Sequence, residues 1–173
     1  MRDYWLAKLI SSVAEVDSRK RLQKSIYLLQ HAGCPLQFNY ILHYYGPYSF
    51  ELASLIDQLD GAEVIKEFPE PTEFGSVRYK SRITDKGNRI LIDFEKTGDG
   101  KQASAKITPF VPLFKDLNKE DPSVLELAAT IAYFYEGDWA EAQKQTSIFK
   151  RLSKKDNNLK QAFGLAKRFK KST

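Results

Sequence analysis

Apolar residues recur every three or four positions along most of the chain, the spacing that places them on one face of an α-helix. In the first half this spacing predicts helices over residues 4–16, 19–32 and 49–61. Ser18 and Ser49 stand at the starts of the second and third helices, where a side-chain oxygen can cap the first turn. The expected core stripe of the second helix consists of Leu22, Ile26 and Leu29.

Two regions have the composition of β-structure. Residues 38–45 are rich in aromatic and branched side chains and predict a strand that ends at Gly46. Residues 63–67 and 76–83 predict a hairpin with a long, irregular tip. Three residues that favour turns lie between these two runs: Pro69, Pro71 and Gly75.

The pattern changes at residues 97–106, which are mostly small and polar and predict a linker. A fourth helix is expected just before it, from Thr84 to Lys96. After the linker the spacing is helical throughout, and Asp121 followed by Pro122 marks the start of the most apolar helix. The helices predicted in this half cover residues 107–117, 124–135, 139–153 and 157–170.

The first elements follow the order helix, helix, strand, helix, strand, wing and strand, which is the order of a winged helix-turn-helix. We therefore expect an α+β, mainly helical fold. Residues 1–96 would form a winged-helix-like domain with a small three-stranded sheet. Residues 107–173 would form a helical extension packed on that domain.

Composition narrows the class of protein further. The 173 residues are 42% hydrophobic and 28% charged, which suits one domain or two small domains that share an interface. No apolar run reaches the roughly 18–20 residues that span a bilayer, and the N-terminus has no secretory pattern. The single cysteine, Cys34, has no partner for an internal disulfide. We expect a cytoplasmic protein with no membrane partner.

Motifs for catalysis and cofactor binding are absent from the sequence. It contains no phosphate-binding loop, no dinucleotide-binding glycine pattern and no zinc-protease or hydrolase motif. His31, Cys34 and His43 supply only three potential metal ligands, and a pair of Cys34 with a histidine has no local signature of a nucleophile. We expect no catalytic residue, no metal site and no cofactor.

The net charge of +5 is distributed unevenly. Residues 139–173 hold ten Lys and Arg against two acids, so the rest of the chain is slightly acidic. A basic end of this kind is either a solvated helical face or a surface for phosphates or an acidic protein. The predicted third helix, in contrast, carries Glu51, Asp57 and Asp60 and no basic residue, so it would repel the phosphates of DNA.

One basic stripe keeps a nucleic-acid alternative open. Arg78, Lys80 and Arg82 alternate along the last predicted strand and therefore project from one face. The stripe is either a phosphate-binding surface or a solvated face paired with the glutamates of the wing. The complete candidate nucleic-acid site is Arg78, Lys80, Arg82, Lys150, Arg151, Lys154 and Lys155.

Tyrosines crowd one short segment that joins the predicted strand to the third helix. Tyr44, Tyr45 and Tyr48 surround the Gly46-Pro47 turn, with Tyr40 and His43 close by. Tyrosine is amphipathic and is enriched at protein interfaces. These rings either seal the junction between the elements or form a surface for a partner.

Four segments resemble the bacterial YwgA-like proteins, which are mostly uncharacterised. They are RKRLQKSIYLL at residues 19–29, HYYGPYS at 43–49, DPSVLELAAT at 121–130 and DWAEA at 138–142. The first two are also similar, more distantly, to the Panacea (SocA-like) antitoxin domain, which is thought to neutralise toxins by protein contact. The resemblance implies a winged-helix-like core with helical additions, a prokaryotic cytosolic setting and no established enzyme activity.

These observations predict a non-enzymatic protein-interaction domain, antitoxin-like or associated with defence, that covers a functional surface of its partner. The partner-binding residues expected are Gln23, Tyr27, Tyr44, Tyr45 and Tyr48. Gln23 and Tyr27 lie four positions apart on one face of the second helix. The alternative is a nucleic-acid-binding transcriptional regulator that uses the basic wing strand and the basic C-terminal helices. A homo-oligomer remains open.

Overall fold

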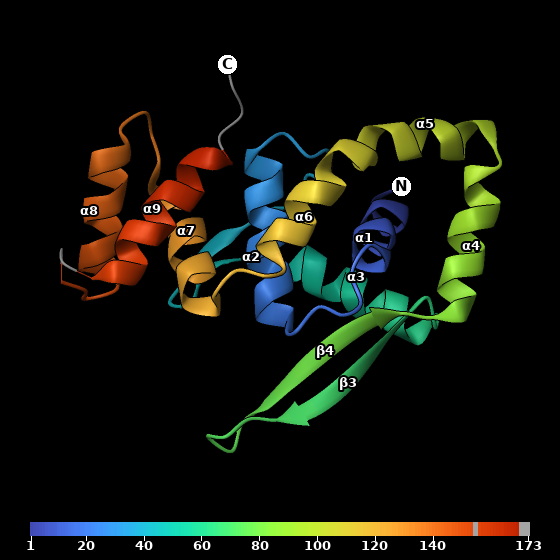
Figure 1. Ribbon diagram of the computed structural model, residues 1–173, viewed down its shortest axis with the longest axis horizontal. Coiled ribbons are helices and arrows are strands. Elements are labelled where there is room, and N and C mark those ends of the chain that lie inside the picture. The colour runs from blue at the N-terminus through green and yellow to red at the C-terminus, as the bar shows by residue number, and fades with distance from the viewer. Residues whose placement is uncertain (154–155, 170–173) are drawn as a thin grey trace.

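The computed structural model describes residues 1–153 and 156–169, which form a mainly helical fold with two small antiparallel sheets (Figure 1). The helices of the first half are α1 (Arg2–Ser11), α2 (Arg19–His31), α3 (Phe50–Gly61) and α4 (Asp85–Glu95). The second half contains α5 (Gly98–Ile107), the short 3-10 helix η1 (Thr108–Phe110), α6 (Val111–Leu117), α7 (Pro122–Phe134), α8 (Trp139–Phe149) and α9 (Asn157–Arg168). None of the described helices is long and apolar enough to cross a membrane.

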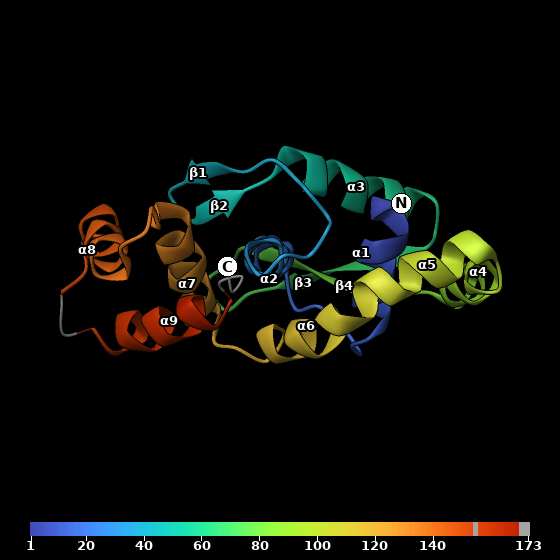
Figure 2. The same ribbon diagram turned by 90° about the horizontal axis from the view of Figure 1, so that it is seen from above.

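Helix α2 lies at the centre of the molecule, and Figure 2 shows it nearly end-on with the other elements around it. The predicted stripe of Leu22, Ile26 and Leu29 is fully buried, which confirms the helical spacing seen in the sequence. Ser18 caps this helix through its hydroxyl oxygen, which accepts a hydrogen bond from the backbone N–H of Arg21 at 3.0 Å. Buried side chains from both halves of the chain join in one hydrophobic cluster around this helix.

The first helix is shorter than the apolar pattern predicts. It ends at Ser11 rather than at Val16. Val16 instead forms an antiparallel bridge with Ser81, and the two residues exchange both backbone hydrogen bonds at 2.9 Å. The side chain of Val16 is nevertheless fully buried. Its apolar character therefore reflects burial beside a strand, which periodicity alone does not distinguish from burial on a helix.

The strand expected over residues 38–45 is wrong in extent. Only β1 (Ile41–His43) is extended and paired, and its partner is β2 (Gly46–Tyr48), which was expected to be a turn that ends the strand. Ile41 faces Tyr48 and His43 faces Gly46, so Tyr44 and Tyr45 form the two-residue loop. Gly46 has a φ of +86°, a left-handed conformation that glycine adopts without steric cost.

The second hairpin consists of β3 (Ile65–Pro71) and β4 (Val77–Ile83), and Figure 1 shows it projecting from the helical body. Its first strand is longer and its tip is shorter than predicted, because Pro69 and Pro71 lie within β3. Proline is tolerated there because β3 is an edge strand that pairs with β4 alone. The tip closes between Thr72 and Ser76.

Residues 97–106, which are expected to form a linker, instead contribute the N-cap and most of helix α5. Thr97 caps the helix, and its hydroxyl accepts a hydrogen bond from the N–H of Gly100 at 3.0 Å. A Cβ at Gly100 would lie 1.8 Å from the carbonyl oxygen of Phe94, so the small residue permits a sharp corner between α4 and α5. Trp5 donates a hydrogen bond to the carbonyl of Ala103 at 3.0 Å, which ties α5 to α1. The division of the chain into two parts stays a prediction.

The expected single three-stranded sheet is also wrong. The described residues form two separate two-stranded sheets, with the Val16–Ser81 bridge beside β4. The β1–β2 hairpin does not join the β3–β4 hairpin because it packs against α2 and α7 instead. The winged helix-turn-helix assignment stays a prediction, while the mainly helical character is confirmed.

Candidate functional site

The tyrosine-rich hairpin β1–β2 is fixed to the central helix by Gln23. The side chain of Gln23 is only 2% exposed and contacts the backbone of Ser49 from both ends of its amide. Its Nε2 donates to the carbonyl of Ser49 at 2.8 Å, and its Oε1 accepts from the N–H of Ser49 at 2.9 Å. Gln23 therefore positions the start of α3, and its predicted place on an exposed interface face is not what the structure shows.

Lys24 makes a second buried connection between α2 and the hairpin. Its ammonium donates to the carbonyl of Pro47 at 2.7 Å, and the residue is 3% exposed. Burial lowers the pKa of Lys24 to about 8, because removal from water disfavours the charged form, while the carboxylate of Glu126 opposes part of this effect. The backbone of Gly46 lies close to α7, because a Cβ on this residue would lie 2.9 Å from Thr130 Oγ1.

Glu126 of α7 is the negative centre of this region. Its carboxylate forms ion pairs with Lys20 of α2 and with Lys150, which follows α8. These two ammonium groups hold the pKa of Glu126 below its usual value against the opposing effect of burial. Lys150 also donates to the carbonyl of Tyr44, so the hairpin loop, α7 and the end of α8 share one polar connection.

A pocket of about 570 Å³ opens between α2, the β1–β2 hairpin and α3; we call it the hairpin pocket. Its walls combine exposed apolar side chains with buried polar ones. The lining residues are Arg19, Lys20, Gln23, Lys24, Ile41, His43, Tyr45, Tyr48, Phe50, Ala53 and Ile56. Ile56 is fully buried, whereas Ile41, Tyr45 and Phe50 are 52%, 53% and 69% exposed. Apolar groups so accessible beside a cavity suit a binding surface.

The pocket rim carries several ring contacts. Tyr48 and Phe50 meet edge to face with ring centres 5.0 Å apart, and His43 stacks on Tyr45 at 5.7 Å. The ammonium of Lys20 lies 4.8 Å from the centre of the Tyr45 ring. The exposed rings are therefore held by neighbours rather than free, which lowers the entropy cost of using them for binding.

The five residues predicted to bind a partner do not form one surface. Gln23, Tyr45 and Tyr48 meet at the hairpin pocket, although Gln23 is structural. Tyr44 is exposed on the loop beside the pocket and packs 6.3 Å from the Phe149 ring. Tyr27 lies elsewhere, partly buried against Tyr40 with ring centres 4.9 Å apart. A role for any of them in binding stays a prediction.

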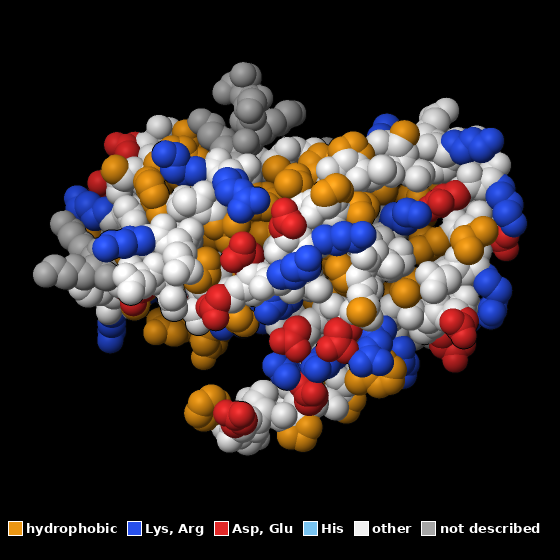
Figure 3. Space-filling model, in the orientation of Figure 1, with side chains coloured by type: hydrophobic (Ala, Val, Ile, Leu, Met, Phe, Trp, Pro, Cys, Tyr) orange, Lys and Arg blue, Asp and Glu red, His pale blue; other side chains and the backbone are white. Residues whose placement is uncertain are grey.

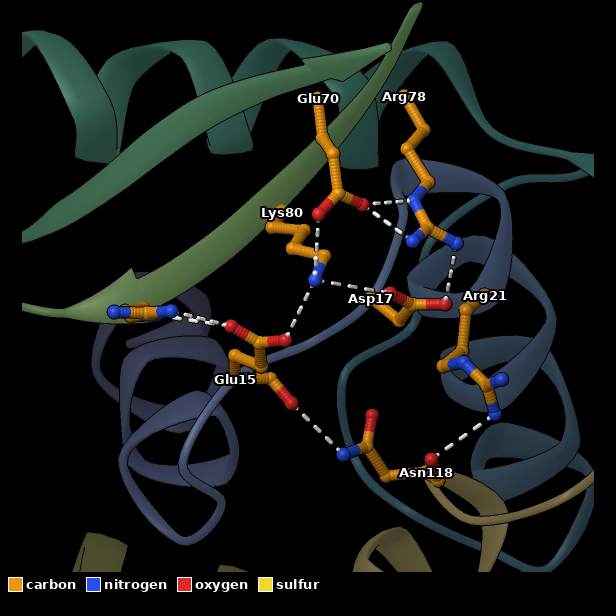
Figure 4. Close-up of polar contacts among 8 residues, drawn as sticks. Glu15, Asp17, Arg21, Glu70, Arg78, Lys80 and Asn118 are labelled. Atoms are coloured by element: carbon orange, nitrogen blue, oxygen red, sulfur yellow. Dashed lines mark hydrogen bonds and ion pairs between the residues drawn. The ribbon is translucent and has the colours of Figure 1, made fainter. Parts of the chain in front are cut away.

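The basic stripe of β4 is neutralised within the chain (Figure 4). Lys80 contacts Glu15 at 3.0 Å and Glu70 at 3.1 Å, and it lies 3.7 Å from Asp17. The other two cations of the stripe are also paired: Arg78 with Asp17 and Glu70, and Arg82 with Glu15. Figure 3 shows the resulting mixture of basic and acidic side chains at the base of the β3–β4 hairpin.

The remaining residues of the nucleic-acid alternative are spread around the end of α8. Lys150 is ion-paired with Glu126 and its side chain is 6% exposed, whereas Arg151 is exposed. Lys154 and Lys155 lie outside the described residues. The structure thus places Lys150 in the hairpin network and apart from the stripe of β4.

Cys34 does not have the surroundings of a nucleophile. Its side chain is buried, and burial raises the pKa of the thiol to about 12. A thiol with this pKa carries almost no thiolate at neutral pH. Across residues 1–153 and 156–169, no group of three or more His, Cys, Asp or Glu side chains is arranged to hold a metal ion.

Sequence reasoning missed Lys20, Lys24 and Phe50, which line the pocket, and Glu126, which pairs with Lys20 from α7. A sequence signal existed for one of them, because Glu126 is an isolated acid in the most apolar helix. A buried position for such an acid requires a cationic partner. Lys24 gave no such signal, because lysine is seldom buried.

The chain was compared with known proteins. No model of a protein family matches it. It is 29% identical over 149 residues to "Uncharacterized protein YwgA" of Bacillus subtilis, an alignment that covers 86% of this chain and 82% of that protein. It is 31% identical over 141 residues to a DNA ADP-ribosyl glycohydrolase of Thermus aquaticus, covering 79% of this chain. The second alignment spans only 37% of the Thermus protein.

These similarities do not confirm the more distant resemblance to the Panacea domain, which stays a prediction. The similarity to the Bacillus protein extends over nearly the whole of both chains and agrees with the resemblance of the four sequence segments. It supports a YwgA-like, uncharacterised family as the one to which this chain is related.

Proposed function

We propose that this chain is a non-enzymatic protein-interaction domain and that a partner protein docks in the hairpin pocket. The observation that carries the proposal is the exposure of Ile41, Tyr45 and Phe50 around a cavity of about 570 Å³. Aromatic side chains beside a concave surface are typical centres of protein–protein binding energy. Antitoxin-like action would follow if the docked segment belongs to the partner's functional surface and is covered by this chain.

The charges of the chain favour a protein partner over a nucleic acid. Nucleic-acid binding depends on cations that release counterions from phosphates. Arg78, Lys80 and Arg82 are already paired with acids of this chain, and so is Lys150. Binding of DNA at these positions would first break internal ion pairs, so little net electrostatic gain remains.

The Thermus relative is much longer than the segment that resembles this chain. That protein is named a DNA ADP-ribosyl glycohydrolase, and the similar segment occupies 37% of its length. A segment of this kind can serve the larger protein by binding a partner rather than by performing its chemistry. The lack of a catalytic motif in the present sequence agrees with that role.

A pocket-filling variant tests the proposal. Ala53→Trp places a large ring in the hairpin pocket, whereas Ser54→Trp adds the same ring at the next, exposed position of α3. Tagged chains are used for affinity capture from the native host in the presence of nuclease, and the captured protein is then purified and the complex reconstituted. The proposal predicts a stoichiometric complex that Ala53→Trp weakens at least tenfold and Ser54→Trp leaves intact.

Two outcomes would contradict it. Equal binding by both tryptophan variants would place the interface away from the hairpin pocket. Recovery of nucleic acid, with every captured protein lost after nuclease treatment, would favour the nucleic-acid alternative.

A further inference from the structure

We propose that the hairpin pocket selects an acidic segment of its partner, in which a carboxylate beside an apolar or aromatic side chain binds next to Lys20 and Lys24. The inference rests on the proposed function and specifies the chemistry of the docked partner. The carboxylate would approach the two lysine ammonium groups, and the apolar group would contact the exposed wall of Ile41, Tyr45 and Phe50.

The charge around the pocket is unbalanced. The single carboxylate of Glu126 forms ion pairs with Lys20 and Lys150, and the buried ammonium of Lys24 lies near this group without an ion pair of its own within the described residues. Glu126 does not line the pocket, whereas Lys20 and Lys24 do. The cations therefore lie on the pocket side and their counterion lies behind them, on α7. A negatively charged group in the pocket would reduce the mutual repulsion of the lysines.

The hydrogen bonding of Lys24 is incomplete. An ammonium group has three donors, and within the described residues that of Lys24 has one hydrogen-bond acceptor, the carbonyl of Pro47. A charge at 3% exposure is costly unless it is paired and hydrogen-bonded. Lys20 is exposed and can turn toward a ligand without leaving α2. A carboxylate accepts at two oxygens and can therefore bind both lysines.

The third cation that lines the pocket, Arg19, does not provide a further binding place for a carboxylate. Arg19 is held by the carboxylates of Glu67 and Asp57, so its charge is already balanced. Beyond Arg19 the surface of α3 is acidic, with Glu51 and Asp60 in addition to Asp57. A polyanion that continued past the pocket along α3 would be repelled. A single acidic side chain on a peptide fits this charge pattern better than the phosphate backbone of a nucleic acid.

Small probes test the selection directly. 4-Phenylbutanoate and 4-phenylbutanamide share a ring and a chain length and differ in charge. Each is titrated into ¹⁵N-labelled protein, and backbone amide shifts report both the place and the affinity of binding. We expect the carboxylate to shift the amides around Lys24 and Ser49 and to bind at least fivefold more tightly than the amide. We also expect that the decamer of thymidylate does not compete with it.

Lysine variants show which charges cause the preference. Lys24→Met and Lys20→Met should each reduce the preference for the carboxylate to less than twofold. Lys101→Met, on the exposed surface of α5, removes the same charge away from the pocket and should keep the preference at the wild-type value. Lys20→Met serves where Lys24→Met fails to fold, since Lys20 is exposed.

The failures of the two proposals are distinguishable. Equal binding of both probes in the pocket overturns the acidic selection and leaves the pocket as a docking site. Displacement of the carboxylate by the thymidylate decamer also overturns the selection, in favour of a phosphate ligand. Shifts from the carboxylate that fall outside the pocket overturn it as well. The docking site itself is tested separately, and it fails if Ala53→Trp leaves the partner complex unchanged.

Discussion

The ammonium of Lys24 and the carbonyl oxygen of Pro47 lie 2.7 Å apart and join the central helix to the tyrosine-rich hairpin. This buried contact places a positive charge next to the Gly46-Pro47 segment. In the sequence, this segment is notable only for the tyrosines around it. Because the charge is nearly removed from water, it contributes to the pH dependence of stability and to the charge of the adjoining pocket.

Lys24 predicts a distinct dependence of stability on pH. Its pKa falls to about 8 in the folded chain from a usual value of 10.5, so between these values the unfolded chain binds more protons. Stability therefore rises as pH increases through this window. The wild type should gain about 2–3 kcal/mol relative to Lys24→Met between pH 7 and pH 10.5. Urea unfolding of both proteins across this range measures the gain.

The comparison with Lys24→Met is needed because other groups titrate in the same window. The raised pKa values of Cys34 and Tyr27 make the folded state lose stability as pH increases. These residues are the same in both proteins, so their effect cancels in the difference. A difference that stays constant from pH 7 to pH 10.5 would contradict a depressed pKa for Lys24.

Gln23 should prove structural rather than a contact for the partner. Gln23→Ala removes both hydrogen bonds to Ser49 and leaves the N–H of Ser49 without a partner, while its carbonyl keeps the bond from the N–H of Ala53. We expect a loss of about 1–3 kcal/mol in the free energy of unfolding. Gln102→Ala, at an exposed position of α5, is the matched control and should change stability little. Equal stability of the two variants would show that the amide clamp does not contribute.

Gly46 is a position where a methyl group cannot be accommodated. Gly46→Ala forces a left-handed backbone on alanine and directs its Cβ to within 2.9 Å of Thr130 Oγ1. We expect it to lower the free energy of unfolding by about 1–3 kcal/mol. Gly164→Ala in α9, which meets no atom within 4 Å, should instead stabilise the chain by about 0.5–1 kcal/mol. Thermal unfolding of both variants and of the wild type measures the two changes. Destabilisation of the same size in both variants would refute the steric account.

The stripe of β4 should serve the fold rather than a ligand. Combined reversal of Arg78, Lys80 and Arg82 to glutamate places each new carboxylate beside Glu15, Asp17 or Glu70. The midpoint of thermal unfolding should fall, and binding of 4-phenylbutanoate in the hairpin pocket should not change. Loss of a nucleic-acid complex in this variant, with the unfolding midpoint preserved, would instead restore the stripe as a binding surface.

The sequence predicted the helices that combine regular apolar spacing with a side-chain cap. Helices α2, α3 and α7 begin where Ser18, Ser49 and Asp121 were expected to cap them. Local chemistry was sufficient there because the capping oxygen lies within three residues of its donor. The same reasoning failed at residues 97–106, where glycine and polar residues pack in a helix against distant Trp5.

The candidate site was only partly accessible to sequence reasoning. The tyrosines pointed to the right turn, and Tyr45 and Tyr48 do line the pocket. The pocket itself depends on contacts between residues about a hundred positions apart, such as Glu126 with Lys20. No local pattern reveals such contacts, and for the same reason the pairing of the β4 stripe with Glu15 and Asp17 could not be read from the wing alone.

Photo-crosslinking tests the central claim of docking at the hairpin pocket most directly. A benzophenone side chain replaces Phe50 on the pocket rim or, as the control, Ile92, which is 57% exposed on α4 and does not line the pocket. The protein is irradiated in extract of the native host after nuclease treatment. We predict that position 50 yields one dominant crosslinked protein whose attachment site lies beside an Asp or Glu that neighbours an apolar or aromatic residue, and that position 92 does not. The same crosslinked protein at both positions, or none at position 50, would contradict docking at this pocket.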